Sequence, residues 1–324
     1  MFSVVIPLYN KVHTVVKTIT SVLNQSYQNF EIIVVDDGST DGSSDLILEN
    51  FRDHRIKIHT QVNAGVSVAR NEGVKFATYS YIAFLDADDL WLEDYLSKMA
   101  EAINQFPDAG MFCSAGLIRN NIDGDVVRVD HKLFGKIQKI EFFHNPHVYL
   151  HTSATVVSKC CFWKAGGFPV GMRRNQDFAL FYCVALITNV VYCGFLNSVY
   201  RGDIEGQSTS FKSNNLVIFS HIIKRYNLVY TFWKKTKSRK RSFLTFLKYE
   251  IRNEMLYLLR INDYLAIKFF INHLESDLLK EFLGCEIIMY KAPIGRQVSM
   301  LYILLTKIAW RLRGYPVVGR KALY

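Results

Sequence analysis

The chain has 324 residues, of which 50% are hydrophobic and 21% are charged. This composition excludes an intrinsically disordered chain, a collagen-like repeat and a small disulfide scaffold, and the length allows two domains. The net charge of +10 is uneven, because residues 216–324 contain 20 Lys and Arg against seven Asp and Glu, whereas residues 1–215 contain 19 against 22.

The cysteines and the N-terminal residues indicate the cellular compartment of the protein. The six cysteines form no CxxC pair or paired spacing pattern, so we expect reduced core residues. Met1-Phe2-Ser3 leads directly into an apolar run, without the basic segment and cleavage site of a signal peptide. Both features predict a cytoplasmic protein.

Short β-branched runs alternate with segments of helical period through the first half of the chain. Strands are expected over residues 3–6, 31–35, 55–59, 81–85 and 109–114, and helices over residues 14–23, 44–51, 66–77 and 92–106. Repeated β-α-β units predict an α/β fold with a largely parallel sheet, helices on both faces and ligands outside the carboxyl ends of the strands. Residues 115–150 are less regular, and we expect surface strands and loops there.

Residues 178–200 carry no charged side chain, and their length alone would suggest a transmembrane helix. We reject that interpretation because Thr188 and Asn189 interrupt the apolar run. The pattern instead predicts a helix that ends near residue 187 and a strand over residues 190–195.

Long helical patterns replace the alternation near the C-terminus. Helices are expected over residues 216–226, 243–261, 264–274 and 298–312, with a basic run at residues 234–241. We therefore divide the chain into an α/β domain, residues 1–215, and a basic amphipathic helical region, residues 216–324.

Three carboxylates follow the expected strand at residues 81–85. Asp86, Asp88 and Asp89 lie within four residues, and such clustered charge is usually compensated by a hard divalent cation shared with a diphosphate. The alternative is that Asp88 or Asp89 only caps the next helix.

A second polar segment, Asp36-Asp37-Gly38-Ser39-Thr40-Asp41, follows the expected strand at residues 31–35. Its acids suit hydrogen bonds to a nucleoside, although a plain turn has the same composition. The sequence contains neither a G-x-G-x-x-G after the first strand nor a P-loop motif, so a dinucleotide-binding domain and a P-loop NTPase lose their main support.

Taken together, these segments resemble the inverting GT-A glycosyltransferases of family 2, which use nucleotide-sugar donors. The matching segments, in the family's order and covering about residues 2–200, are Val4-Val5-Ile6-Pro7-Leu8-Tyr9-Asn10, Ser21 to Tyr27, Val35 to Asp41, Asn63-Ala64-Gly65, Ala69-Arg70-Asn71, Asp86-Ala87-Asp88-Asp89, Gly166-Gly167-Phe168 and Asn175-Gln176-Asp177. The resemblance implies a GT-A catalytic domain over residues 1–215.

The resemblance also implies how the donor is bound. Asp37 would face the base, with Asp36 supporting its turn. Asp86 would approach the ribose, and Arg70 the diphosphate. The full set of implied nucleotide-sugar-binding residues is Pro7, Tyr9, Asp36, Asp37, Gly65, Arg70, Asp86, Ala87 and Asp88.

By the same resemblance, Asp88 would ligate Mn²⁺ or Mg²⁺ and Asp89 would shape the loop. Asp177 would be the general base that deprotonates an acceptor hydroxyl, and the anomeric configuration would invert. The family more often has Glu before this Asp, where Gln176 stands here. A residue that precedes an apolar helix can also be its N-cap, which is the alternative role for Asp177.

Three histidines lie between the Asp86-Ala87-Asp88-Asp89 segment and the Gly166-Gly167-Phe168 segment. His144, His147 and His151 have no nearby Cys or acidic partner in the sequence, so a metal site is disfavoured. In the family, the region of His151 borders the acceptor. We therefore assign His151 and Gln176 to the acceptor side.

The basic region has a role of its own in this hypothesis. A polybasic segment beside amphipathic helices favours an anionic membrane surface, and family relatives that build bacterial surface polysaccharides act on lipid-linked acceptors. We expect transfer from a UDP-sugar to a glycan or lipid-linked glycan in O-antigen, capsule or exopolysaccharide synthesis, by a peripheral protein at the inner face of the cell membrane.

Two alternatives remain open. One is a nucleic-acid- or membrane-binding protein that uses the basic region and has a non-catalytic α/β domain. We expect no nucleic acid partner, because the basic residues lie outside the α/β half and no recognition motif accompanies them. The other is a sugar nucleotidyltransferase, which the segment Leu8-Tyr9-Asn10-Lys11 does not fit.

Overall fold

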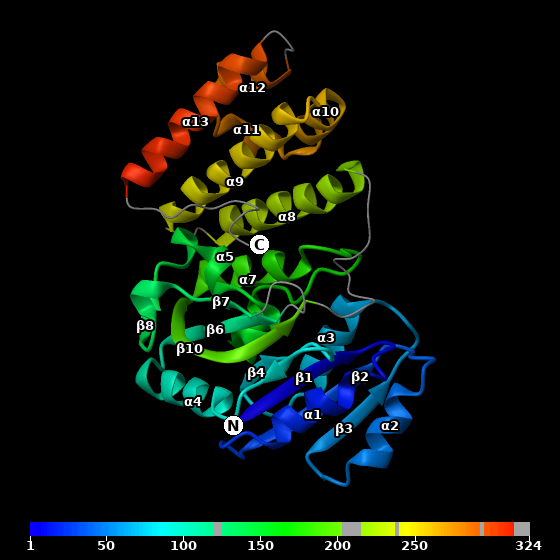
Figure 1. Cartoon of the computed structure of the whole chain (residues 1–324). Coiled ribbons are helices and arrows are strands. Elements are labelled where there is room, and N and C mark those ends of the chain that lie inside the picture. The colour runs from blue at the N-terminus through cyan, green and yellow to red at the C-terminus, as the bar shows by residue number, and fades with distance from the viewer. Residues whose placement is uncertain (120–124, 203–214, 237–239, 292–294, 314–324) are drawn as a thin grey trace. The chain divides into compact units, whose positions relative to one another are not determined.

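The computed structural model describes residues 1–119, 125–202, 215–236, 240–291 and 295–313 (Figure 1). The chain forms two compact units: Met1–Ile140 with Val148–Ser210, and Glu141–His147 with Phe211–Tyr324. Residues 141–147 thus belong to the second unit although they precede most of it in the sequence. The assignment of residues 1–215 as the catalytic domain and of residues 216–324 as a basic amphipathic region remains a prediction.

The first unit confirms the α/β fold with helices on both faces of a sheet. Its strands are β1 (Phe2–Leu8), β2 (Phe30–Asp36), β3 (Ile56–Thr60), β4 (Tyr81–Phe84), β5 (Leu90–Trp91), β6 (Ala109–Arg119), β7 (Val126–Arg128), β8 (Ile137–Ile140), β9 (Thr155–Ser158) and β10 (Asn189–Arg201). The helices include α1 (Val15–Leu23), α2 (Ser43–Asn50), α3 (Val66–Phe76), α4 (Tyr95–Gln105), α5 (Pro146–Tyr149, which crosses the boundary between the units), α6 (Lys159–Lys164) and α7 (Gln176–Ile187).

The sheet is mixed, with the main order β3-β2-β1-β4-β9-β6-β10-β5. The expected parallel pairing holds from β3 to β4 and between β6 and β10. Strand β9 pairs antiparallel with both β4 and β6, and so joins these two parallel parts. The uncharged run at residues 178–200 forms α7 and β10, as predicted, separated at Thr188.

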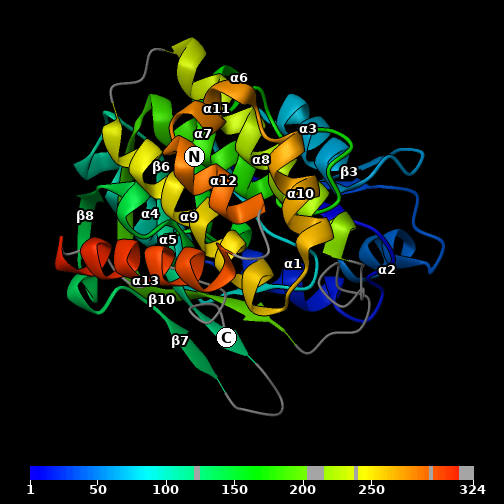
Figure 2. The ribbon, with the colours of Figure 1, turned by 90° about the horizontal axis from the view of Figure 1, so that it is seen from above.

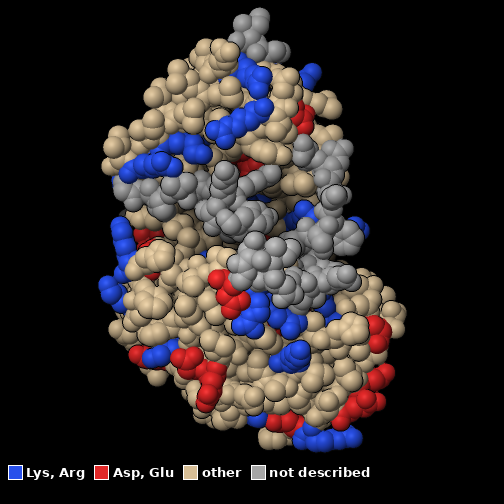
Figure 3. All heavy atoms as spheres, viewed as in Figure 1, with Lys and Arg blue, Asp and Glu red and all other residues tan. Residues whose placement is uncertain are grey.

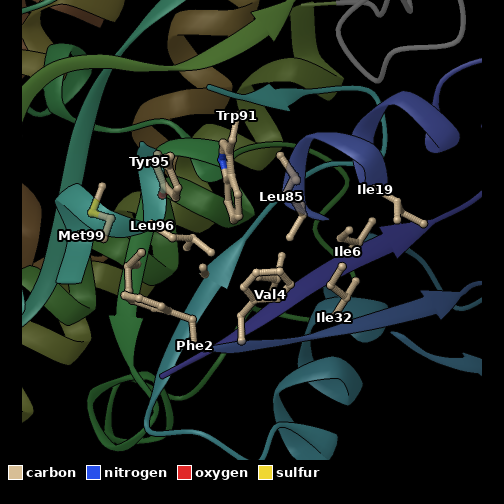
Figure 4. Packing of buried hydrophobic residues seen from close by; sticks show 14 of the residues in the cluster. Phe2, Val4, Ile6, Ile19, Ile32, Leu85, Trp91, Tyr95, Leu96 and Met99 are labelled. Carbon is tan, nitrogen blue, oxygen red and sulfur yellow. The ribbon is translucent and has the colours of Figure 1, made fainter. Parts of the chain in front are cut away.

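Alternate side chains of β1 point to opposite faces of the sheet. Val4 and Ile6 pack with Ile19 of α1 and with residues of α4 in one apolar core (Figure 4). On the opposite face, a methyl group placed on Gly73 of α3 would lie 2.4 Å from Val5 Cγ1. The period of two along the strand therefore lets helices cover both faces, and the glycine allows α3 to approach β1 closely.

The second unit is helical. Its helices are α8 (Asn215–Thr236), α9 (Arg241–Arg260), α10 (Tyr264–His273), α11 (Ser276–Lys280), α12 (Gly284–Lys291) and α13 (Arg296–Leu312), and Figure 2 shows them from above. Phe143 packs edge-on against Phe243 of α9, which places residues 141–147 in this unit. Part of the basic run at 234–241, residues 237–239, lies outside the described residues.

Candidate active site

Polar side chains converge where β1, β2 and β4 end. These strands are parallel, and Leu8 is in register with Asp36. The segments after them therefore leave the sheet at the same edge, and residues 9–12, 37–44 and 86–89 meet there. This is the edge at which open α/β sheets bind ligands.

The two acids after β2 have different partners. Asp36 accepts hydrogen bonds from the Ser39 backbone N–H, at 2.8 Å, and from the Ser44 hydroxyl, so it supports the turn. Asp37 is buried and accepts from the backbone N–H groups of Ala64 and Gly65, each at 2.8 Å. Asp37 thus fixes the loop that leads into α3, where Gly65 has a φ of +94° that favours glycine.

The segment after β1 is fixed by the segment after β2. Asn10 Oδ1 accepts from the Thr40 N–H at 2.9 Å, and the Lys11 N–H donates to Ser43 Oγ at 2.9 Å. Pro7 is half-buried and Tyr9 is exposed beside this contact. The Lys11 Nζ then reaches Asp88 Oδ2 at 2.7 Å.

Each acid of the loop after β4 has a separate environment. Asp86 forms an ion pair with Arg70 of α3, and Asp88 pairs with Lys11. Asp89 is fully buried and accepts from Ser153 Oγ, at 2.5 Å, and from the Arg201 N–H, at 3.1 Å. The three carboxylates therefore point to different partners.

Burial raises the pKa of Asp89 well above its ordinary value, and the charges of Asp86 and Asp88 raise it further. His151 Nε2 lies 3.8 Å from Asp89 Oδ2. Burial, followed by the charge of Arg128, lowers the pKa of His151 to about 3. His151 is therefore neutral at physiological pH, and its contact with Asp89 is not an ion pair.

The Arg70 guanidinium is the prominent buried cation of the site. One nitrogen, Nη2, bonds Asp86, and the group lies over the ring of Phe168, 5.0 Å from its centroid. Its Nε and Nη1 are buried without a hydrogen-bond partner among the described residues. Unsatisfied buried donors are rare in native proteins and call for an explanation, such as an anionic ligand.

Asn71, next to Arg70, holds the Gly166-Gly167-Phe168 turn. Its Nδ2 donates to the Phe168 carbonyl at 2.9 Å, and its Oδ1 accepts from the Phe168 N–H at 2.8 Å. A methyl group on Gly167 would meet Asn71 Oδ1 at 3.0 Å, and its φ is +71°. This close contact explains why glycine stands there.

Asp177 lies in the first turn of α7, which begins at Gln176. The N-cap interpretation of Asp177 is therefore wrong, because Asn175, with a φ of +62°, occupies that position. The Phe178 N–H donates to Asp177 Oδ1 at 2.8 Å. Burial raises the pKa of Asp177, and the charges of Arg70 and Asp86 act on it with opposite signs, so these three groups share one electrostatic environment.

The other residues predicted for the acceptor side, and the three histidines, lie in different parts of the molecule. Gln176 is buried, and its Oε1 has no partner among the described residues. His144 and His147 belong to the second unit, where His147 Nε2 lies 2.8 Å from Glu250, whereas His151 belongs to the first. Among the described residues, no three His, Cys, Asp or Glu side chains form a group that could hold a metal.

Several site residues escaped the sequence interpretation. Arg201, at the end of β10, donates from Nε to the Asp88 carbonyl at 2.7 Å. Thr14, the N-cap residue of α1, and Thr18 of that helix both donate to the Ala87 carbonyl, at 2.8 and 3.0 Å. The available signal for Arg201 was its place as the first charged residue after the uncharged run at 178–200.

Comparisons with known proteins identify the family. The sequence profile described as Glycosyl transferase family 2 matches residues 3–162. A UDP-Glc:alpha-D-GlcNAc-diphosphoundecaprenol beta-1,3-glucosyltransferase, WfgD of Escherichia coli, is 33% identical over 205 residues, which are 62% of this chain and 77% of that protein. An uncharacterized glycosyltransferase of Rickettsia conorii is 49% identical over 213 residues, 66% of this chain and 34% of that protein.

A solved structure has the same fold. S. aureus TarS, residues 1–349, superimposes with a TM-score of 0.67 at 14% identity and covers 96% of this chain and 91% of that chain. The same protein in complex with UDP-GlcNAc gives a TM-score of 0.63.

The chain therefore belongs to glycosyltransferase family 2 and has the GT-A fold. The resemblance stated from the sequence motifs is confirmed at the level of family and fold. The match spans only 30% and 34% of the length of the rickettsial relatives from Rickettsia bellii and Rickettsia conorii.

Proposed function

We propose that this protein transfers a sugar from a nucleotide-diphospho-sugar to an acceptor hydroxyl, with inversion at the anomeric carbon. UDP-sugars are the favoured donors. WfgD is named for UDP-Glc and TarS was crystallised with UDP-GlcNAc, and both names support this choice.

One arrangement carries the proposal: Arg70 pairs with Asp86 and lies over the Phe168 ring, which packs edge-on against Phe181 of α7, the helix that contains Asp177. A buried cation with two unpartnered N–H donors suits an anionic diphosphate. A buried carboxylate whose pKa is raised by burial, as that of Asp177 is, suits a general base. In this proposal α3 supplies the group for the leaving diphosphate and α7 supplies the group for the acceptor.

In the proposed reaction Asp177 takes the proton of the acceptor hydroxyl. That oxygen forms a bond to the anomeric carbon while the bond from this carbon to the diphosphate oxygen breaks. The electron pair leaves with the nucleoside diphosphate, whose negative charge the Arg70 N–H donors stabilise. A single displacement inverts the configuration of the anomeric carbon.

The donor set fits a divalent cation shared with substrate rather than a cation held by protein alone. Mg²⁺ is usually bound by one or two carboxylates together with substrate phosphates, and the Asp88 carboxylate is the side chain that would hold Mg²⁺ or Mn²⁺ here. Such a cation would add compensation for the charge of the departing diphosphate. Lys11 already compensates the Asp88 charge when no cation is bound.

We also propose that the acceptor is a lipid-linked glycan of bacterial surface-polysaccharide synthesis and that residues 216–324 bind an anionic membrane surface at the cytoplasmic face. The WfgD name includes a diphosphoundecaprenol acceptor, and the basic charge of residues 216–324 suits anionic lipid. Within the described ranges, no helix is both long and apolar enough to cross a membrane.

A panel of nucleotides tests the donor site. UDP, GDP, dTDP and ADP are added with and without Mn²⁺, and the unfolding temperature is measured, because a ligand that binds only the folded state stabilises it. We expect a stabilisation by UDP that Mn²⁺ increases.

The variant Asp88→Asn should keep the shift given by UDP alone and lose the additional effect of Mn²⁺. The exposed acid Asp108 provides the control, and Asp108→Asn should respond as the wild type does. If no nucleotide raises the unfolding temperature of the wild-type protein, the proposed donor site is wrong.

A further inference from the structure

Helix α13 packs against the second unit through one narrow face. Ser299, Ile303 and Trp310 are its buried residues. The Trp310 ring stacks on Tyr249 of α9, with the centroids 4.4 Å apart and the planes 25° from parallel. These contacts fix the rotation of the helix about its axis, and so they determine which side chains face outward.

The outward face of α13 is an apolar stripe. Its members are spaced alternately by three and four residues and have exposed fractions of 53–84%: Val298, Leu301, Leu305, Ile308 and Leu312. At 100° per residue, this spacing keeps them on one line of the helix, nearly opposite the buried face. Single exposed leucines are ordinary on protein surfaces, but a contiguous stripe of five indicates a binding surface.

The charges around the apolar stripe are basic. Helix α13 contains no acidic residue, and the exposed Lys291, Arg311 and Arg313 lie before it and at its end. The one acid between residues 284 and 313, Glu286, is buried and bound to Arg252. Figure 3 shows Lys and Arg atoms over the α12 and α13 part of the unit, among uncharged atoms.

The pKa of Lys307, a half-buried lysine of α13, indicates the sign of the electrostatic potential around it. Burial lowers the pKa of Lys307, and the charges of Arg260 and Arg311 lower it further. The charges that act on Lys307 are therefore positive.

Two occupants could cover such a stripe, and the charges discriminate between them. In a dimer formed through α13, the two basic helix ends would be brought together with no acid to pair with them. An anionic lipid surface offers both an apolar layer and negative headgroups, and helices of this kind lie in the plane of that surface. We propose that the apolar stripe of α13 inserts into the headgroup boundary of an anionic bilayer.

This inference rests on the proposed action at a lipid-linked acceptor, because it names the element that would hold the enzyme at its membrane. Binding to lipid is measured without any sugar transfer, however. The membrane-binding proposal and the catalytic proposal can therefore be refuted separately.

The test is sedimentation of the full chain with sucrose-loaded vesicles of phosphatidylglycerol and phosphatidylcholine, or of phosphatidylcholine alone, at low salt. We expect binding only to the anionic vesicles. The triple variant Leu301→Ser, Leu305→Ser and Ile308→Ser should bind them roughly tenfold more weakly or worse, because buried apolar area sets the strength of such binding. Arg311→Gln and Arg313→Gln should each weaken binding roughly fivefold.

The matched control removes exposed apolar side chains from other helices or turns of the same unit: Val217→Ser, Ile261→Ser and Leu265→Ser. This variant should bind as the wild type does, and circular dichroism should give the same helicity for both triple variants. Equal binding by the stripe variant and the wild type would overturn the proposal. So would a dimer in sedimentation equilibrium that the stripe variant abolishes, since a second copy would then cover the surface.

Discussion

Buried acids beside the proposed donor site and buried acids of the helical unit have pKa values shifted in opposite directions. In the first unit, burial raises the pKa of Asp89 and Asp177. In the second, burial alone would raise the pKa of Glu250 and Glu286, but bound basic side chains lower both below the ordinary value. The helical unit thus pairs its buried charges internally, whereas the sheet edge leaves charge to be compensated by a ligand.

The partners explain this difference. Glu250 lies between His147 and Arg225, and Glu286 takes two hydrogen bonds from Arg252 and one from Tyr290. Arg70, by contrast, has two buried nitrogen atoms without partners among the described residues. A complete set of partners indicates a role in stability, and an incomplete one indicates a role in binding or catalysis.

The largest expected effect is on turnover. Asp177→Asn removes the proposed proton acceptor, and we expect the rate of sugar transfer to fall by roughly 10²- to 10⁴-fold. The fold and the UDP affinity should be retained. Asp45→Asn changes an acid in the first turn of another helix, α2, and provides the control, with turnover near that of the wild type.

The pH dependence of kcat/KM in the wild-type enzyme should report the ionisation of Asp177. Asp177 acts as a base only when ionised, so kcat/KM should fall as the pH decreases through its pKa. Because burial raises that pKa, the fall should begin at a higher pH than for an exposed aspartate. Full activity of the Asn variant, or an activity that does not change in acid, would contradict the assignment.

The next effect concerns stability in the helical unit. Glu286→Gln leaves the Arg252 charge without its partner, and we expect the free energy of unfolding to fall by about 3–5 kcal/mol. Asp277→Asn removes an acid from an exposed ion pair of the same unit and should have little effect on the free energy of unfolding. Chemical denaturation of the two variants measures the difference, and equal losses would refute the distinction between buried and exposed pairs.

At the sheet edge, removing a buried charge should affect binding more than stability. Arg70→Met deletes the unpartnered donors, and UDP affinity measured by calorimetry should fall roughly 10- to 100-fold, the usual range for hydrogen bonds to a charged group. Arg55→Met removes a cation paired with Asp53 instead, and its UDP affinity should be unchanged. An unaltered affinity in Arg70→Met would remove Arg70 from the donor site.

The smallest effect concerns the packing of α3. Gly73→Ala places a methyl group against Val5, so we expect a loss of about 1–3 kcal/mol in the free energy of unfolding. Gly284, the first residue of α12, has open space around the same position. Gly284→Ala should therefore be neutral or stabilise by up to about 1 kcal/mol, and a loss equal to that of Gly73→Ala would show that crowding is not the cause.

Local patterns predicted most of the α/β unit, since β-branched runs gave β1 to β4 and helical periods gave α1 to α4. The antiparallel place of β9 between β4 and β6 was not predictable, because it depends on pairing between distant segments. The same holds for Lys11, which reaches Asp88 across 77 residues. The alternative N-cap role of Asp177 failed because the left-handed backbone of Asn175 starts α7 earlier than the apolar pattern does.

The configuration of the first sugar product tests the central claim most directly. Wild-type enzyme is given UDP-glucose or UDP-N-acetylglucosamine, both α-linked, with water as the acceptor, and proton NMR follows the anomer that is released first. The account predicts the β anomer from the wild type and no release above background from Asp177→Asn. Early release of the α anomer would contradict a single displacement with Asp177 as the base.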